Sequence, residues 1–244
     1  MEKITISAIQ MNSKLGNKKA NFEKIRELIK KNLIKTDIIV LPEVWSIGWF
    51  PKIFRENAEN ISNSETLKFL SNIAKENNSW IVGGSFIIKD ENNYFNTCPV
   101  INREGKLVAT YSKMHLFSYY GCEEGKYITA GKDPVLVDIE GIKIGLTICY
   151  DIRFPEIYRA YRKAGADLLI NCAAWGSTKP IPWECMTKSR AVENQTYMIG
   201  LTQCGYIQDN EWNLGHSRII DYKGETISEI KEQKEGIVSA TIDL

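Results

Sequence analysis

The chain has 244 residues, of which 43% are apolar and 25% are charged, so it has the composition of an ordinary folded domain and not of a disordered or fibrous protein. Its 31 basic residues against 30 acidic ones give a formal net charge of +1, which offers no electrostatic reason to bind nucleic acid or an anionic membrane. The longest apolar runs, such as residues 38–41, are far too short to span a bilayer. The first residues look like a strand and lack the apolar core of a signal peptide, so we expect a cytoplasmic protein with no membrane partner.

In the first half of the chain, short apolar runs alternate with helical stretches. The pattern predicts a strand at 4–9, a helix at 18–33, a strand at 37–41, a helix capped by Ser64, and strands at 80–88, 94–102 and 106–111. Turn residues at 90–93 and 103–105 separate the last three of these runs.

The second half repeats this order of elements without repeating its residues. It predicts strands at 135–139 and 143–148, a helix from near Pro155, a strand at 167–172, a helix at about 183–194, and strands at 196–202, 217–221, 226–230 and 236–242. Strands followed by helices imply sheets covered by helices on one face. Two such sheets stacked face to face would bring the loops of both halves to one rim. We expect a single domain over residues 1–244.

The six cysteines are scattered, and no CxxC pair occurs. The two histidines, His115 and His216, are far apart in the sequence, so no zinc site is predicted. A sizeable core does not need disulfides, so free thiols are expected, and a reactive one needs evidence of its own.

Two polar residues stand at the ends of apolar runs. Glu43 directly follows the buried strand at 37–41, and Lys113 follows the strand at 106–111 and opens a long, aromatic-rich loop. Loops at the rim of a sheet build binding sites. Taken alone, however, an acid or a lysine in such a place is more often simply solvated.

A third segment, CYDIRFPE at 149–156, places a cysteine at the end of a strand. The buried strand ends at Cys149, and Pro155 with Glu156 marks the start of a helix. This strand–elbow–helix arrangement resembles turns that expose a nucleophile above a sheet, with the next backbone N–H free to meet an oxyanion. A plain core cysteine at a strand end is the competing interpretation.

Together, the segments around Glu43, Lys113 and Cys149 resemble the carbon–nitrogen hydrolase (nitrilase) family, whose active site is Glu–Lys–Cys in that chain order. The resemblance extends to SRAVENQ at 189–195 and GHSRII at 215–220, so it spans nearly the whole chain. It implies an α/β fold, a four-layer αββα sandwich with pseudo-duplicated halves, and a homodimer formed through the outer helices. Within the family, the sequence looks most like the ω-amidase (Nit2-like) group.

The family pattern also implies the roles of individual residues. Glu43 would be the base, Cys149 would attack the amide carbon, and Lys113 with the backbone N–H of Tyr150 would bind the oxyanion. The products would be a carboxylate and ammonia, formed through a thioester without any cofactor. The pattern includes a second glutamate that positions substrate and lysine. Glu124 fits that position best, and the adjacent Glu123 is the alternative.

Several aromatic and charged residues are candidates for the substrate pocket. Trp175 follows a buried strand and is expected to form an apolar wall, with simple core packing as the alternative. Arg153 could recognise a substrate carboxylate or pair with an acid such as Glu156 at the helix start. The three aromatic candidates to line or cover the pocket are Phe117, Tyr119 and Tyr120.

Other polar residues are expected to be structural. Arg190 and Glu193 lie three apart on a predicted helix and would stabilise it. His115 and His216 lack the sequence context of a papain-like base, so we expect structural roles for both.

The leading hypothesis is an amidase for a small ω-amide of a dicarboxylate, such as 2-oxoglutaramate or succinamate, which the subgroup resemblance implies. An amidase for deaminated glutathione or an N-carbamoyl compound is the alternative within the same chemistry. A non-catalytic homologue that binds a metabolite or a protein is the alternative from another class. Retention of Glu43, Lys113 and Cys149 together argues against it.

Overall fold

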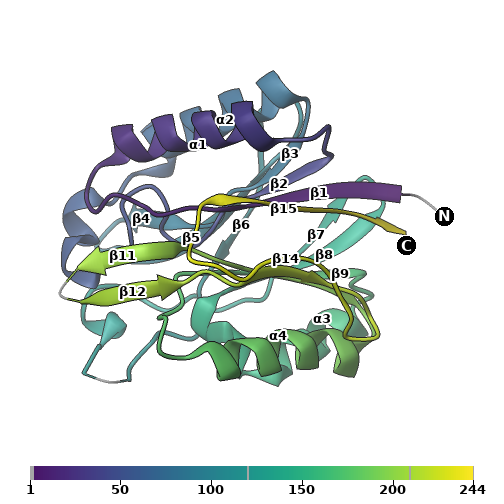
Figure 1. Cartoon of the computed structure of the whole chain (residues 1–244). Helices are drawn as coiled ribbons and strands as arrows, with labels where there is room; N and C mark the ends of the chain where they lie inside the picture. Colours follow the sequence, from purple (N-terminus) through teal and green to yellow (C-terminus); the bar gives the residue numbers. More distant parts are fainter. Residues whose placement is uncertain (1–2, 120, 209, 244) are drawn as a thin grey trace.

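Four layers make up the molecule, and the computed structural model describes them over residues 3–119, 121–208 and 210–243. Helices α1 (Lys18–Asn32) and α2 (Glu65–Asn77) lie on one side of two β-sheets, and helices α3 (Pro155–Lys163) and α4 (Pro180–Asn194) lie on the other (Figure 1). The predicted αββα order is confirmed. In the described part of the chain, no helix is both long and apolar enough to cross a membrane.

The first sheet is organised around three parallel strands, β1 (Lys3–Gln10), β2 (Ile38–Val40) and β3 (Trp80–Val82). Strand β5 (Asn93–Ile101) pairs antiparallel with β3, β4 (Phe86–Asp90) and β6 (Leu107–Ser112). The last strand, β15 (Gly236–Asp243), returns from the second half of the chain and pairs antiparallel with β1. The C-terminal segment therefore closes one edge of the N-terminal sheet.

The second sheet repeats this plan around the parallel strands β8 (Ile142–Ile148), β9 (Leu168–Ala173) and β10 (Tyr197–Thr202). Strand β7 (Leu136–Ile139) pairs antiparallel with β8, as β15 does with β1. On the other side, β10 pairs antiparallel with β13 (Ser217–Ile220), which in turn pairs antiparallel with β14 (Thr226–Ile230). The two halves are thus duplicated in strand order, as the sequence pattern predicted.

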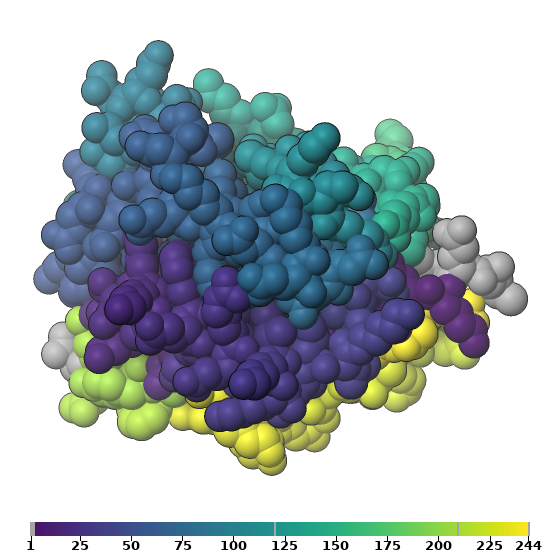
Figure 2. Space-filling view, turned by 90° about the horizontal axis from the view of Figure 1, so that it is seen from above, coloured from purple at the N-terminus to yellow at the C-terminus, as the bar shows by residue number. Residues whose placement is uncertain are grey.

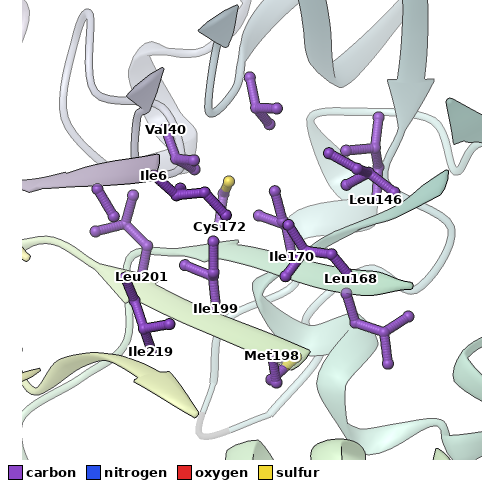
Figure 3. Close-up of a cluster of buried hydrophobic side chains, with 14 of the residues drawn as sticks. Ile6, Val40, Leu146, Leu168, Ile170, Cys172, Met198, Ile199, Leu201 and Ile219 are labelled. Carbon is purple, nitrogen blue, oxygen red and sulfur yellow. The ribbon is translucent and has the colours of Figure 1, made fainter. Parts of the chain in front are cut away.

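Apolar side chains from the facing sheets fill the space between them. Figure 3 shows Ile6 and Val40 of the first sheet beside Cys172, Ile199 and Leu201 of the second, and all five are buried in one core cluster. Burial of such side chains contributes about 1.5–3 kcal/mol each. Seen from above, the N-terminal elements cover one face of the molecule, and the yellow C-terminal segment emerges along its border (Figure 2).

The helices cover the outer faces with their own apolar stripes. In α2, Phe69, Leu70 and Ile73 are buried against the first sheet. The helix begins where predicted, because the Ser64 hydroxyl accepts a hydrogen bond from the Leu67 backbone N–H. Local capping and periodicity were sufficient to place this element.

One expectation about strands was wrong, and one pair of strands was missed. The strand predicted at 80–88 is broken by Gly83 and Gly84 into β3 and β4. At Gly84, φ is +63°, and an added Cβ would lie 2.0 Å from the Pro42 carbonyl oxygen, so only glycine lets the chain pass there. The hairpin of β11 (Cys204–Gln208) and β12 (Glu211–Leu214) was not predicted.

Candidate active site

Three charged side chains from remote stretches of the chain meet in one buried cluster. Glu43 follows β2, Lys113 follows β6, and Glu124 lies in the loop after it. The Lys113 Nζ donates to Glu43 Oε1 at 2.9 Å and to the two Glu124 oxygens at 2.9 and 3.1 Å. Glu43 and Glu124 have exposed fractions of 0%, and Lys113 has one of 1%.

Cys149 reaches the same cluster from the end of β8. Its φ of +46° is a left-handed conformation that residues other than glycine rarely adopt, and a 3₁₀ turn, Cys149–Arg153, follows directly. Burial raises the pKa of the Cys149 thiol well above its ordinary value, and the nearby Glu43 carboxylate raises it further. Both effects favour the protonated form of the Cys149 sulfur.

The charge of Lys113 is fixed by its two carboxylate partners. Burial alone would lower the pKa of this ammonium group, but Glu124 and then Glu43 outweigh that effect and hold the pKa well above its usual range. Burial raises the pKa of Glu124, and Lys113 partly offsets the rise. The cluster therefore holds a permanent cation between two carboxyl groups, next to a sulfur.

Glu43 is held by polar groups that sequence reasoning missed. The Asn96 side chain donates to Glu43 Oε1 at 2.9 Å, and the Ala174 backbone N–H donates to Oε2 at 2.9 Å. The Gln203 side chain donates to the Glu43 backbone carbonyl at 2.6 Å. The available signal for Asn96 was an asparagine among the buried residues of β5. The Ala174 donor is a backbone N–H, so the residue type gives no sign of it.

The alternative between the two adjacent glutamates is decided by burial. Glu124 points into the cluster, and its carboxylate also accepts from the Phe117 backbone N–H at 2.7 Å. Glu123 points outward and pairs with Lys126 on the surface. The second glutamate of the cluster is therefore Glu124.

A cavity of about 540 Å³ opens over Cys149. All five candidate substrate-binding residues line it, namely Phe117, Tyr119, Tyr150, Arg153 and Trp175. Tyr120 lies outside the described residues. The unpredicted hairpin of β11 and β12 adds Ile207, Asn210, Glu211 and Trp212 to the lining, so a segment without a clear sequence pattern forms part of the cavity wall.

Arg153 stands in the cavity wall over two aromatic rings. Its guanidinium carbon lies 5.7 Å from the Tyr150 ring centroid and 5.4 Å from that of Trp175. Arg153 and Glu156 do not form the ion pair that was the alternative. Trp175 is both wall and core, since it lines the cavity and is buried in the core cluster between the sheets. Its indole N–H donates to the Lys179 carbonyl at 2.8 Å.

The remaining polar candidates lie outside the cavity lining. His115 hydrogen bonds to Asp151, and His216 contacts Glu184 at 3.1 Å. Arg190 pairs with Glu193 at 2.7 Å, as the helical spacing predicted. The Arg190 side chain also donates twice to the Ile152 carbonyl, at 3.0 and 2.7 Å, and so ties α4 to the turn that follows Cys149.

Metal chemistry has no candidate ligand set in the described ranges, where no three His, Cys, Asp or Glu side chains are grouped to hold an ion. The reactive groups at the site are a thiol, carboxylates, an ammonium group and backbone N–H donors. Such a set can carry out acyl transfer through a sulfur nucleophile.

Comparison with known proteins agrees with this set of groups. The model of the carbon–nitrogen hydrolase family matches residues 5–244. The chain belongs to this family. A 2-oxoglutaramate amidase from Bacillus subtilis is 34% identical over 242 residues, which cover 99% of this chain and 92% of the relative. A deaminated glutathione amidase from Dictyostelium discoideum is 35% identical over 94% of this chain and 84% of its own.

The fold agrees with solved structures of the same superfamily. Saccharomyces cerevisiae Nit3, a member of branch 10 of the nitrilase superfamily, superposes with a TM-score of 0.90 at 29% identity, over 99% of this chain and 90% of its own. The chain is therefore a carbon–nitrogen hydrolase of the amidase type, with a nitrilase-type fold.

Proposed function

We propose that this enzyme hydrolyses the terminal amide of a small dicarboxylate monoamide, with Cys149 as the nucleophile. The observation that carries the proposal is the buried cluster itself, in which Lys113 is held between Glu43 and Glu124, and Glu43 is near enough to the Cys149 thiol to raise its pKa. A thiol with a raised pKa needs a base in contact at the moment of attack, and Glu43 is that base.

The reaction then proceeds in two halves. As the Cys149 sulfur bonds to the amide carbon, its proton moves to Glu43, and the carbonyl electrons move onto oxygen. Protonated Glu43 next gives this proton to the leaving nitrogen, so that ammonia departs and a thioester remains. Water, deprotonated by Glu43, attacks the thioester and releases the carboxylic acid and the thiol.

Lys113 and the Tyr150 backbone N–H stabilise the oxyanion in both halves. Tyr150 directly follows the nucleophile, so its N–H points to the side on which the oxyanion forms. Loss of one such donor in a comparable site costs about 3–4 kcal/mol. Glu124 shares the Lys113 ammonium group with Glu43, and this prevents the cation from pairing with the base alone.

The cavity supports a substrate with an anionic end. Arg153 presents a cation at a wall otherwise built from aromatic rings, where a remote carboxylate would be desolvated and paired. Relatives named as 2-oxoglutaramate amidases support that compound as the first substrate to test.

A second candidate is deaminated glutathione. The cavity of about 540 Å³ is larger than a five-carbon ω-amide requires, and a relative of 35% identity bears that activity in its name. A longer acyl chain would reach the hairpin residues that line the cavity.

Ammonia release from both compounds, measured side by side with succinamate and an N-carbamoyl amine, tests the proposal. We expect 2-oxoglutaramate to give the highest kcat/KM and the Cys149→Ala variant to release no ammonia. Turnover of only deaminated glutathione or the carbamoyl compound would refute the dicarboxylate assignment. Full activity of Cys149→Ala would refute the mechanism.

We also propose that the enzyme is a homodimer that acts in the cytoplasm. Ile181 and Val192 are exposed to 72% and 49% on one face of α4, which supports a contact through this outer helix. All six cysteines are free, which suits a reducing compartment. Light scattering of the wild type and of an Ile181→Glu variant tests the dimer, and a monomeric wild type would contradict it.

A further inference from the structure

One fully buried carboxylate, that of Asp151, has no part in the reaction as described. It accepts four hydrogen bonds and so has its acceptor positions filled. Its Oδ2 accepts from the Tyr111 hydroxyl at 2.6 Å and from the Ile148 backbone N–H at 2.9 Å. Its Oδ1 accepts from the backbone N–H and from the ring Nδ1 of His115 at 2.9 and 2.8 Å. Because an ionised carboxylate only accepts, the His115 Nδ1 carries the proton.

The positions of these donors along the chain are informative. Tyr111 lies two residues before Lys113, and His115 lies two residues after it. Ile148 is the residue directly before Cys149, and Asp151 itself lies two residues beyond that cysteine. One carboxylate therefore binds the chain on both sides of the lysine and on both sides of the nucleophile.

This contact also joins the two sheets. Lys113 follows a strand of the first sheet, whereas Cys149 follows a strand of the second. The left-handed conformation of Cys149 costs about 1–3 kcal/mol and persists only where neighbouring contacts fix it. Hydrogen bonds to an ionised acceptor are short and roughly twice as strong as neutral ones, so they are suited to this task.

We propose that Asp151 is a positioning residue that sets the distance between the Lys113 ammonium group and the Cys149 sulfur. It acts on the lysine segment through its hydrogen bonds with Tyr111 and His115. The inference rests on the proposed function of that cluster. Asp151 itself does not touch substrate and exchanges no proton during turnover. Its effect is to keep the Lys113 ammonium group and the Cys149 sulfur at a fixed distance, although they come from different sheets.

The variant Asp151→Asn tests this with little change in volume. Its amide NH₂ faces donors on one side, so the hold on the lysine segment or on the elbow is lost. A misplacement of about 1 Å costs on the order of 100-fold in rate, so we expect kcat to fall by about that factor while KM stays close to the wild-type value. The rate of alkylation of Cys149 by iodoacetamide, followed by intact mass, is expected to fall as well.

Glu59→Gln is the matched control. Glu59 is also a buried carboxylate with several donors, namely the Ser64 hydroxyl, the Thr66 hydroxyl and backbone N–H, and the Lys18 ammonium group. It lies outside the cavity lining and the catalytic cluster. We expect this variant to lower Tm but to keep wild-type kcat and wild-type alkylation of Cys149.

The outcomes separate clearly. A folded Asp151→Asn protein with wild-type kcat and alkylation rate would overturn the proposal, and so would a Glu59→Gln protein that loses kcat in proportion to its loss of Tm. Should Asp151→Asn not fold, Tyr111→Phe removes one donor only and is expected to lower kcat in the same direction with KM unchanged. Wild-type kcat in that variant would overturn the proposal. The alkylation rates need no substrate, so they test the inference even if no amide is hydrolysed.

Discussion

Replacement of Lys113 by methionine tests the charge balance of the cluster. The substitution keeps an unbranched side chain and removes the cation that Glu43 and Glu124 share. Removal of one partner from a buried ion pair costs about 3–5 kcal/mol. In a chain of this size, 1 kcal/mol shifts Tm by about 2–4 °C, so we expect Tm to fall by roughly 6–20 °C.

The loss should depend on pH in a defined direction. Burial already raises the pKa of Glu124 in the wild type, and without Lys113 it rises further. A carboxyl group with a folded-state pKa above its unfolded value favours the folded state at low pH, and that advantage is lost as the pH rises through the folded-state pKa. The deficit of Lys113→Met relative to wild type is therefore expected to be largest at pH 8 and to shrink toward pH 5.

Thermal unfolding of both proteins from pH 5 to pH 8 measures this. Lys126→Met is the control, because Lys126 pairs with Glu123 in a surface contact and its side chain is 71% exposed. Its stability should stay within about 0.5 kcal/mol of wild type at every pH. A Lys113→Met deficit that is constant with pH, or no larger than that of the control, would refute the reasoning about the buried carboxylates.

Two further predictions concern the backbone near Glu43 and the wall of the cavity. Gly84→Ala is expected to lower both Tm and kcat, because its Cβ would meet the Pro42 carbonyl at 2.0 Å, directly before Glu43. Gly16→Ala shares a positive φ, +66° against +63°, but has no atom within 4 Å of its Cβ, so it should cost only about 1–2 kcal/mol and leave kcat unchanged. Parallel measurements of Tm and kcat check this, and equal losses of kcat in the two variants would contradict the steric argument. Arg153→Met is expected to raise KM for carboxylate-bearing amides but not for an uncharged amide of the same length, which steady-state kinetics would show. An equal rise for both would exclude Arg153 as the anion-binding group.

Local sequence signals were sufficient where the interactions that form an element are themselves local. The helix over α1 follows from its apolar spacing, and Ser64 marks the start of α2 by capping it. The break at Gly83 and Gly84 was missed because both flanking runs are apolar, and the reason for the break is a contact with Pro42, forty residues earlier.

Long-range pairing could not be inferred from such patterns. The return of β15 to β1 joins residues more than two hundred positions apart, and nothing in either segment specifies the other. The hairpin of β11 and β12 carries mixed polar and aromatic residues whose alternation is interrupted by a bulge, so no strand period is visible.

In the site, too, some residues could be predicted from local sequence and others could not. Glu43, Lys113 and Cys149 each stand at the end of a strand, so the sequence indicated that they could meet at one rim. The importance of Asn96 and Asp151 lies only in the groups that they face, and an isolated asparagine or aspartate carries no such information.

Detection of a thioester on Cys149 during turnover tests most directly whether this cysteine is the nucleophile. Rapid acid quench of the enzyme during turnover of 2-oxoglutaramate, followed by peptide mass spectrometry, should show the acyl group on the peptide that contains Cys149. The Glu43→Gln variant should show no such adduct, because it lacks the base. An acyl group on Cys122, which lines the same cavity, or turnover without any acylated cysteine, would contradict the central claim.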